Sequence, residues 1–179
     1  MRFWGKFFGF IIGFMFGRIF GALLGLWLGH LYDKRAASGV GFREVLGQAK
    51  NRQAIFFNTT FAVMGHVAKA SGQVTETDIR IATLLMDQMR LTGEARKEAQ
   101  QAFREGKSAD FDLRSSLQAF RVITMGRKEL VQMFIEIQIQ TALSDGELDP
   151  AEHAILMTIA QELGYGRAQL DELLKRWQA

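Results

Sequence analysis

Apolar residues recur at helical spacing through most of the chain after residue 53. Between Ile79 and Met89 they stand at positions i, i+3, i+6, i+7 and i+10, which places them on one face of an α-helix. Six further stripes of this kind occupy residues 55–67, 99–103, 117–125, 130–143, 154–163 and 170–177. The pattern predicts an all-α bundle of about seven helices over residues 53–179.

Short glycine-bearing or polar segments separate these stripes. They are residues 106–108, Gly126, residues 145–146 and residues 164–166. The chain has a single proline, Pro150, so it lacks the frequent turn residues that a β-rich fold requires.

The bundle contains an internal repeat, because residues 68–78 align with residues 142–152 and an apolar helix follows each copy. Each copy reads as helix, turn, helix. Its glycine can take the left-handed conformation that ends a helix, its apolar residue can enter the core, and a capping box can begin the next helix. The first copy supplies Gly72, Val74, Thr75 and Asp78, and the second supplies Gly146, Leu148, Asp149 and Glu152, with Pro150 at the first helical position. The repeat predicts two helical hairpins of the same design.

An apolar run of 23 residues, 7–29, precedes the bundle and carries one charge, Arg18. At about 1.5 Å per residue a helix of this length spans about 34 Å, enough to cross a bilayer. Arg18 opposes insertion by roughly 2.5–3.5 kcal/mol, and the many Phe, Ile and Leu residues outweigh it. A secretory signal peptide is disfavoured, because the run is too long and no small-residue cleavage site follows. One membrane-spanning helix is therefore predicted within residues 1–32.

Glycine recurs at every fourth position through this segment. The repeat comprises Gly5, Gly9, Gly13, Gly17, Gly21, Gly25 and Gly29. Small residues let helices approach closely in lipid, so the repeat predicts a packing face for self-association, either between two crossing helices or among several. The alternative is a flexible anchor in which the glycines carry no function. Arg18 either snorkels towards water or faces a partner helix or a pore.

The charges indicate how the segment lies in the membrane. Trp4 on one side, with Trp27 and Tyr32 on the other, stand where aromatic rings favour the two interfaces. The next 20 residues carry five cations suited to anionic lipid headgroups: Lys34, Arg35, Arg43, Lys50 and Arg52. This bias predicts an N-terminus outside the cytoplasm and a cytoplasmic C-terminal body. Residues 53–179 hold 14 basic and 17 acidic side chains, which argues against a nucleic-acid partner.

Residue chemistry offers little support for catalysis. His30, His66 and His153 are far apart without an adjacent nucleophile, no phosphate-binding glycine loop is present, and the absence of cysteine excludes thiolate chemistry. Four acidic residues lie close together in the second turn, namely Asp145, Glu147, Asp149 and Glu152. They are weak metal candidates, because their spacing does not fit an EF-hand and capping accounts for two of them. Neither an enzyme nor a cofactor is expected.

Three segments carry a resemblance to a known family: residues 52–66, residues 72–76 and residues 134–140. They closely resemble the DjlA family of membrane-anchored DnaJ-type co-chaperones of proteobacteria. The body from about Gln53 to Trp177 is similar to the TerB-like helical domain of tellurite-resistance proteins. The resemblance implies a protein of the bacterial inner membrane, a periplasmic N-terminus, a homodimer formed by the membrane helix, and a stress-response role through DnaK.

The chain departs from that family in one respect. The family continues into a J-domain whose His-Pro-Asp tripeptide stimulates the DnaK ATPase, whereas the one proline here stands in Asp149-Pro150-Ala151. The chain is therefore expected to lack DnaK stimulation and to be the N-terminal portion of a longer protein. The alternative is a form of the family that kept the anchor and the bundle and lost the J-domain. Its expected parts are a membrane segment (1–32), a basic juxtamembrane link (33–52) and a TerB-like domain (53–179). The alternative is a glycine-zipper membrane protein that forms an oligomer or pore, with the helical domain as a stress-related binding module.

Overall fold

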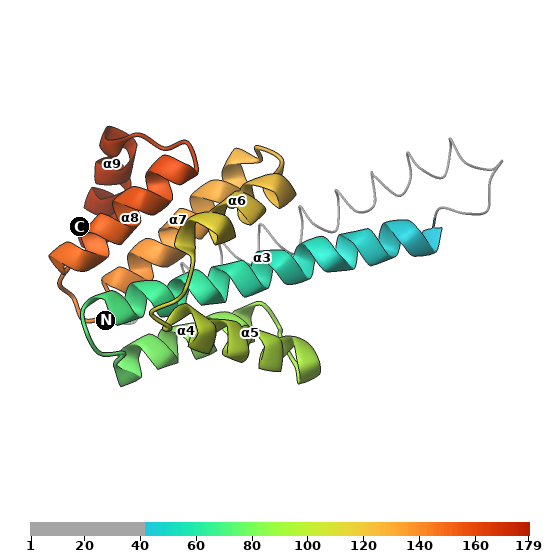
Figure 1. The fold of residues 1–179 in the computed structure, drawn as a ribbon. Coiled ribbons are helices and arrows are strands. Elements are labelled where there is room, and N and C mark those ends of the chain that lie inside the picture. The colour runs from blue at the N-terminus through green and yellow to red at the C-terminus, as the bar shows by residue number, and fades with distance from the viewer. Residues whose placement is uncertain (1–41) are drawn as a thin grey trace.

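The computed structural model of the chain describes residues 42–179, with side chains from residue 47 onward, and this part is entirely helical (Figure 1). The helices are α3 (Phe42–Ala70), α4 (Glu76–Gln88), α5 (Gly93–Gly106), α6 (Leu113–Thr124), α7 (Lys128–Ala142), α8 (Pro150–Glu162) and α9 (Arg167–Gln178). Each predicted apolar stripe corresponds to one of these seven helices. The prediction of an all-α bundle is confirmed.

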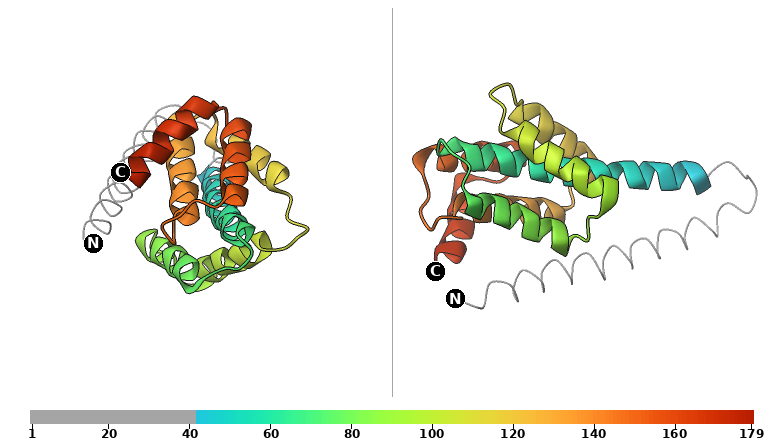
Figure 2. Two further views of the ribbon diagram at one scale, coloured as in Figure 1. Left: turned by 90° about the vertical axis from the view of Figure 1, so that its left-hand side faces the viewer. Right: turned by 90° about the horizontal axis from the view of Figure 1, so that it is seen from below.

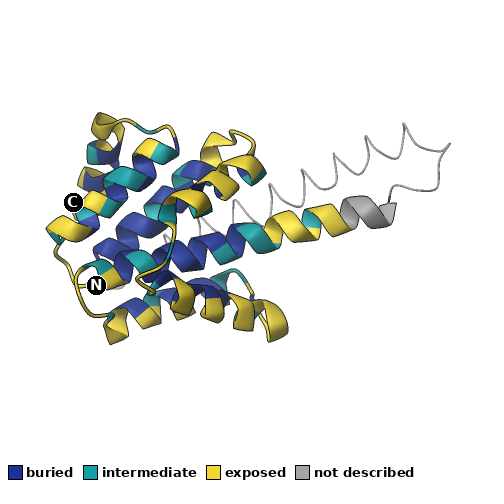
Figure 3. Ribbon diagram, in the orientation of Figure 1, coloured by how far each residue is buried: buried dark blue, intermediate teal, exposed yellow. Residues whose placement is uncertain are grey.

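Helix α3 is the axis of the bundle, and α5, α6, α7 and α8 all pack against it. Its residues from Phe56 onward enter the core, where Phe61, Val63 and Met64 are fully buried. The preceding part of α3 extends beyond the other helices, and its described side chains are mostly exposed (Figures 1–3). The 52/53 boundary expected from the sequence lies within this uninterrupted helix.

Aromatic rings fill the space between α3, α6 and α7. The ring centroid of Phe120 lies 4.2 Å from that of Phe134 and 5.4 Å from that of Phe56. Beside them, the buried Gln138 amide donates from Nε2 to the carbonyl oxygen of Thr60 at 3.3 Å, which links α7 to α3. The core of the domain is therefore built around the inner half of α3.

Helices α3 and α5 approach each other through two glycines. A Cβ atom at Gly65 would lie 2.1 Å from the carbonyl oxygen of Phe103, and one at Gly106 would lie 1.7 Å from the carbonyl oxygen of Ala62. No side chain fits at these distances, so glycine sets the spacing of the two backbones. The sequence pattern treats Gly106 as part of a separating segment, whereas in the structure it is the buried last residue of α5.

The start of α4 differs from the expected apolar stripe. Ile79, the first residue of that stripe, is 53% exposed, whereas its neighbour Asp78 is buried. The physical reason is the capping box, which turns Asp78 towards the interior. One residue further along a helix corresponds to a rotation of about 100°, so Ile79 points outward. The inner face of α4 is formed by Ala82, Leu85 and Met86.

Within the described residues, no helix combines the length and apolarity needed to cross a membrane. The predicted spanning helix with its glycine repeat lies outside those residues, as do Arg18, Trp4, Trp27, Tyr32, Lys34 and Arg35. The side chain of Arg43 also lies outside them. Lys50 and Arg52 are described, and both are exposed on the extension of α3.

Candidate functional site at the paired helix starts

The two repeated turns meet at the end of the bundle where α3 and α7 finish. The hydroxyl Oγ of Ser144, which follows α7, donates to Oδ1 of Asp78 near the start of α4 at 2.5 Å. This contact joins residues 66 positions apart in the sequence. It places the buried carboxyl group of Asp78 between the two copies of the repeat.

Asp78 forms the capping box of α4 together with Thr75. Its Oδ2 accepts from the backbone N–H of Thr75 at 2.7 Å and from the Thr75 hydroxyl at 2.8 Å. In return, Thr75 Oγ1 accepts from the backbone N–H of Asp78 at 3.3 Å. The carboxylate thus has three donors, including Ser144, although the residue is only 4% exposed.

The second copy has the corresponding arrangement at the start of α8. Asp149 Oδ1 accepts from the backbone N–H of Ala151 at 2.7 Å, and Glu152 Oε2 accepts from the backbone N–H of Asp149 at 3.1 Å. Pro150 occupies the first turn, where its missing N–H is not needed. Gly72 (φ 112°) and Gly146 (φ 93°) supply the left-handed residues of the two turns. All four residues that the sequence proposes as caps therefore cap a helix.

Glu152 has an unusual protonation equilibrium. Burial, above all, raises the pKa of its carboxyl group to about 7, and the nearby negative charges of Asp145, Asp149 and Asp78 act in the same direction. The hydrogen bond from the Asp149 backbone opposes the rise. The residue is only 5% exposed. Near pH 7 the protonated and ionised forms of this buried carboxyl group are therefore present in similar amounts.

The contribution of His66 to folding stability has the opposite dependence on pH. The half-buried ring of His66 lies 5.2 Å from that of Phe111, and burial lowers the pKa of its imidazole. Its contribution to folding stability is complete above its unfolded pKa of about 6.5 and is lost as the pH falls through its folded value. No nucleophile is hydrogen-bonded to His66 among the contacts of the described residues.

The acidic turn does not form a cation cage in the described part of the chain. No group of three or more His, Asp or Glu side chains there has an arrangement suited to a metal ion. Asp145 instead accepts from the backbone N–H of Glu147 at 3.1 Å, while Asp149 and Glu152 cap α8. Backbone N–H groups thus engage three of the four carboxylates that were weak metal candidates.

The contact between the two repeats involves one residue that the sequence does not single out. In the alignment of the copies, Ser144 corresponds to Ala70, so the repeat gives no sign of its role. The repeat identifies Asp78 and Glu152 as equivalent positions. It does not indicate that Asp78 turns towards the other copy.

Replacing Glu152 with glutamine should flatten the dependence of stability on pH. The folded-state pKa of about 7 exceeds the unfolded value of 4.5, so the folded state binds more protons between these limits. The contribution of this group is therefore complete below about pH 4.5 and is lost as the pH rises through about 7. Glutamine retains the acceptor that a capping box needs but does not titrate.

Thermal unfolding of the chain in detergent, followed by far-ultraviolet circular dichroism from pH 5 to 8, measures this effect. The wild-type Tm should fall more steeply than that of Glu152→Gln as the pH rises. The matched control is Glu147→Gln, which removes an exposed carboxylate of the same turn and should preserve the wild-type slope. Equal slopes for wild type and Glu152→Gln would show that Glu152 does not titrate in this range.

Two family models match the chain. The model described as the co-chaperone DjlA transmembrane domain matches residues 1–52, and the model described as tellurite resistance protein TerB matches residues 58–175. No solved structure matches.

Curated relatives match most or all of the chain. A protein from Shewanella oneidensis named co-chaperone protein DjlA is 87% identical over 179 residues, which cover 100% of this chain and 68% of the relative. Relatives with the same name from Yersinia pseudotuberculosis and Escherichia coli are 50% and 48% identical, over 98% and 84% of this chain. The matches cover 63% and 55% of those two relatives, so the chain spans between about half and two thirds of their length.

The helical bundle and the two family matches define a TerB-domain protein with an N-terminal segment of the transmembrane type. Within that class, the chain belongs to the DjlA co-chaperone family. The family resemblance inferred from the sequence is thereby confirmed.

Proposed function

We propose that the chain is the anchor and interaction region of a membrane-bound co-chaperone that acts on DnaK. The observation that carries this proposal is the match to co-chaperone DjlA along all 179 residues. In this proposal the protein lies in the bacterial inner membrane with its N-terminus in the periplasm. The helical domain is cytoplasmic and non-enzymatic.

In this proposal each part of the chain has its own role. The glycine face from Gly5 to Gly29 pairs the membrane helices into a homodimer, and the cations of residues 33–52 contact lipid headgroups. The bundle serves as a rigid interaction module for a protein partner. DnaK is reached through a J-domain, whose His-Pro-Asp tripeptide does not occur in these 179 residues.

A reconstitution experiment tests this function. In liposomes the chain alone should leave DnaK ATP turnover at its basal rate. A fourfold excess over the full-length Shewanella oneidensis relative should reduce the stimulation by that relative. Random pairing would leave about one fifth of the full-length protomers paired with each other. The reduction follows if stimulation requires two J-domains in one dimer.

Two variants separate the possible outcomes. Replacing Gly13, Gly17 and Gly21 with leucine should abolish the inhibition without preventing insertion, because bulky side chains keep the helices apart. Inhibition that persists in this variant would contradict pairing through the glycine face and would favour competition by the helical domain. Ion leakage that disappears with Arg18→Leu would instead support an oligomeric pore.

A further inference from the structure

The α6–α7 turn, defined as residues 121–129 with the end of α6 and the start of α7, lies on the side of the bundle from which α3 extends (Figure 1). Helices α3 and α7 both finish at the opposite end, where the hydrogen bond between Ser144 and Asp78 joins the segments that follow them. Helix α7 has 15 residues, so it begins about 22 Å away from that end. Its first residues therefore lie towards the side of the bundle that leads back to residue 42 (Figures 1 and 2).

This turn carries the two most exposed large apolar side chains of the described residues. Val122 is 75% exposed and Met125 is 69% exposed, compared with 53% for Ile79 and 52% for Leu84. Val122 lies in the last turn of α6, and Met125 is the residue that directly follows this helix. Met125 has left-handed backbone angles (φ 50°, ψ 39°), an uncommon conformation for a residue with a side chain. Neither side chain is held in place by packing against the core, because both are largely exposed.

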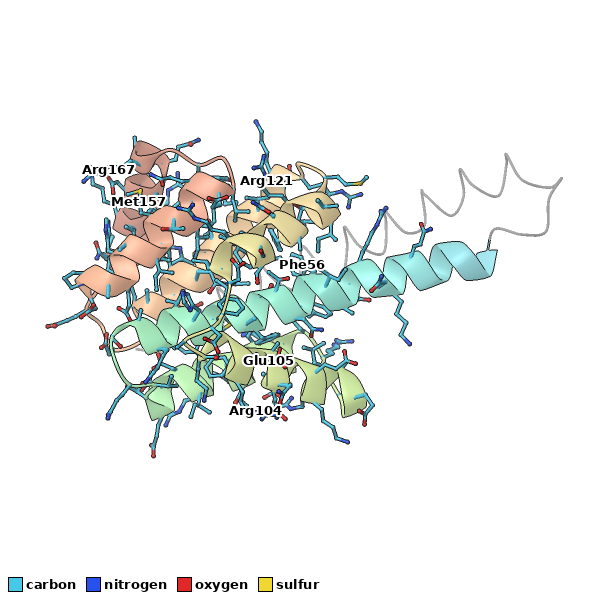
Figure 4. The ribbon with its side chains drawn as sticks, in the orientation of Figure 1. Phe56, Arg104, Glu105, Arg121, Met157 and Arg167 are labelled. Atoms are coloured by element: carbon cyan, nitrogen blue, oxygen red, sulfur yellow. The ribbon has the colours of Figure 1, made fainter. Side chains whose placement is uncertain are left out.

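Three cations are close to this apolar pair in the sequence. Arg121, Arg127 and Lys128 are exposed, and Arg121 lies on α6 in Figure 4. Ion pairs within 4.0 Å engage other cations of the described domain, namely Arg96, Lys97, Arg114 and Arg176. None of those ion pairs includes a cation of the α6–α7 turn. Residues 121–129 contain one acidic residue, Glu129, so the turn has a net positive charge.

We propose that the α6–α7 turn docks on the anionic lipid surface of the membrane that anchors the chain. Val122 and Met125 enter the headgroup layer, while Arg121, Arg127 and Lys128 contact lipid phosphates. Apolar side chains bordered by cations are the combination that binds such an interface. This inference rests on the membrane anchoring proposed above, and it adds a second contact between the chain and the bilayer.

Two observations favour lipid over an acidic protein as the occupant. Two apolar side chains form a much smaller patch than the roughly 800 Å² per partner of a stable protein interface. In addition, the transmembrane family match ends at residue 52, on the same helix α3 that leads into this side of the bundle. The turn is thus tethered near a bilayer, and its charge is complementary to anionic headgroups.

The absence of cysteine from the chain permits a direct test. The full chain carrying Met125→Cys is labelled with an environment-sensitive fluorophore and reconstituted in liposomes that contain nitroxide-bearing lipids. Quenching is expected in vesicles rich in phosphatidylglycerol and should weaken in neutral vesicles or at high salt. A label at Val122→Cys provides an independent probe if Met125→Cys alters the fold. A label at Ile79→Cys is the matched control on exposed apolar surface of α4.

Charge substitutions complete the test. Each change of Arg121, Arg127 or Lys128 to glutamine should weaken the lipid contact about fivefold, in line with the contribution of one cation near an anionic surface. Flotation of the labelled chain with the vesicles checks anchoring separately. If the chain floats but the labels at residues 122 and 125 are quenched no more than the Ile79→Cys label, the proposal is wrong. The proposal is also wrong if the triple glutamine variant is quenched as strongly as the wild type. It is equally wrong if the labels change their fluorescence only when a membrane protein is added to the vesicles.

Discussion

Substitution of Gly106 by alanine should lower the free energy of unfolding by about 3 kcal/mol or more, which would place it among the most damaging single changes in the domain. The new methyl group would lie 1.7 Å from the carbonyl oxygen of Ala62. That atom belongs to the backbone of α3 and cannot rotate away. The two helices must therefore separate, and the packing along their contact is lost. Chemical denaturation of the chain in detergent, followed by circular dichroism, measures the loss.

Gly47→Ala is a matched control within α3. Nothing lies within 4 Å of a Cβ atom at Gly47, so alanine should stabilise the helix there by about 0.5–1 kcal/mol. Gly65→Ala should destabilise like Gly106→Ala, and the double variant should lose less than the sum, because one separation of the helices relieves both clashes. A Gly106→Ala protein as stable as the wild type would show that α3 and α5 are not in close contact.

Substitution of Asp78 by alanine should lower the free energy of unfolding by about 2–3 kcal/mol, because it removes a helix cap and leaves three part-buried donors without their acceptor. The donors are the backbone N–H of Thr75 and the hydroxyl groups of Thr75 and Ser144. A double-mutant cycle with Ser144→Ala should give a coupling energy of about 1–2 kcal/mol. Denaturant unfolding of the four proteins of the cycle measures that coupling.

Asp112→Ala is the control for capping alone. Asp112 Oδ1 accepts from the backbone N–H of Ser115 at 3.0 Å at the exposed start of α6, and no bond of its side chain to a distant helix is present among the described contacts. Its loss should therefore cost less than that of Asp78. If Asp78→Ala and Asp112→Ala were equally mild, or if Asp78 and Ser144 showed no coupling, the link between the two turns would carry no stability.

Helical periodicity was sufficient to find a stripe in each helix, because apolar residues that recur locally stabilise each one. The first part of α3, residues 42–52, precedes its stripe and was not indicated by the pattern. The internal repeat was sufficient to locate the caps, because a capping box involves residues three positions apart. The pattern does not mark the burial of Gln138 in α7, since only the fold brings its amide nitrogen to the Thr60 carbonyl of another helix. Periodicity also misplaced Ile79, because the polar Asp78 beside it is satisfied inside the domain.

Contacts between distant segments limited the sequence-based description of the site. Ser144 meets Asp78 only after α4 and α7 have folded onto the same end of the bundle, and no local spacing encodes that meeting. Gly106 illustrates the same limit. Glycine at the end of a helical stripe ordinarily indicates a turn, and only the neighbouring backbone of α3 reveals its packing role. The metal candidates Asp145, Glu147, Asp149 and Glu152 were similarly a local cluster, and backbone hydrogen bonds engage all but Glu147.

Because α3 is continuous, the direction in which the bundle faces depends on the number of residues in the exposed part of that helix. Residue 42 and the core residue Phe61 belong to one uninterrupted helix, so no joint lies between them. Two residues inserted into the exposed part of α3 would swing the bundle by about 200° around the helix axis while moving it only about 3 Å. Seven inserted residues would move it about 10 Å and return it to within about 20° of its original azimuth. The length of this helix therefore determines both how far the bundle stands from residue 42 and which of its faces points in a given direction.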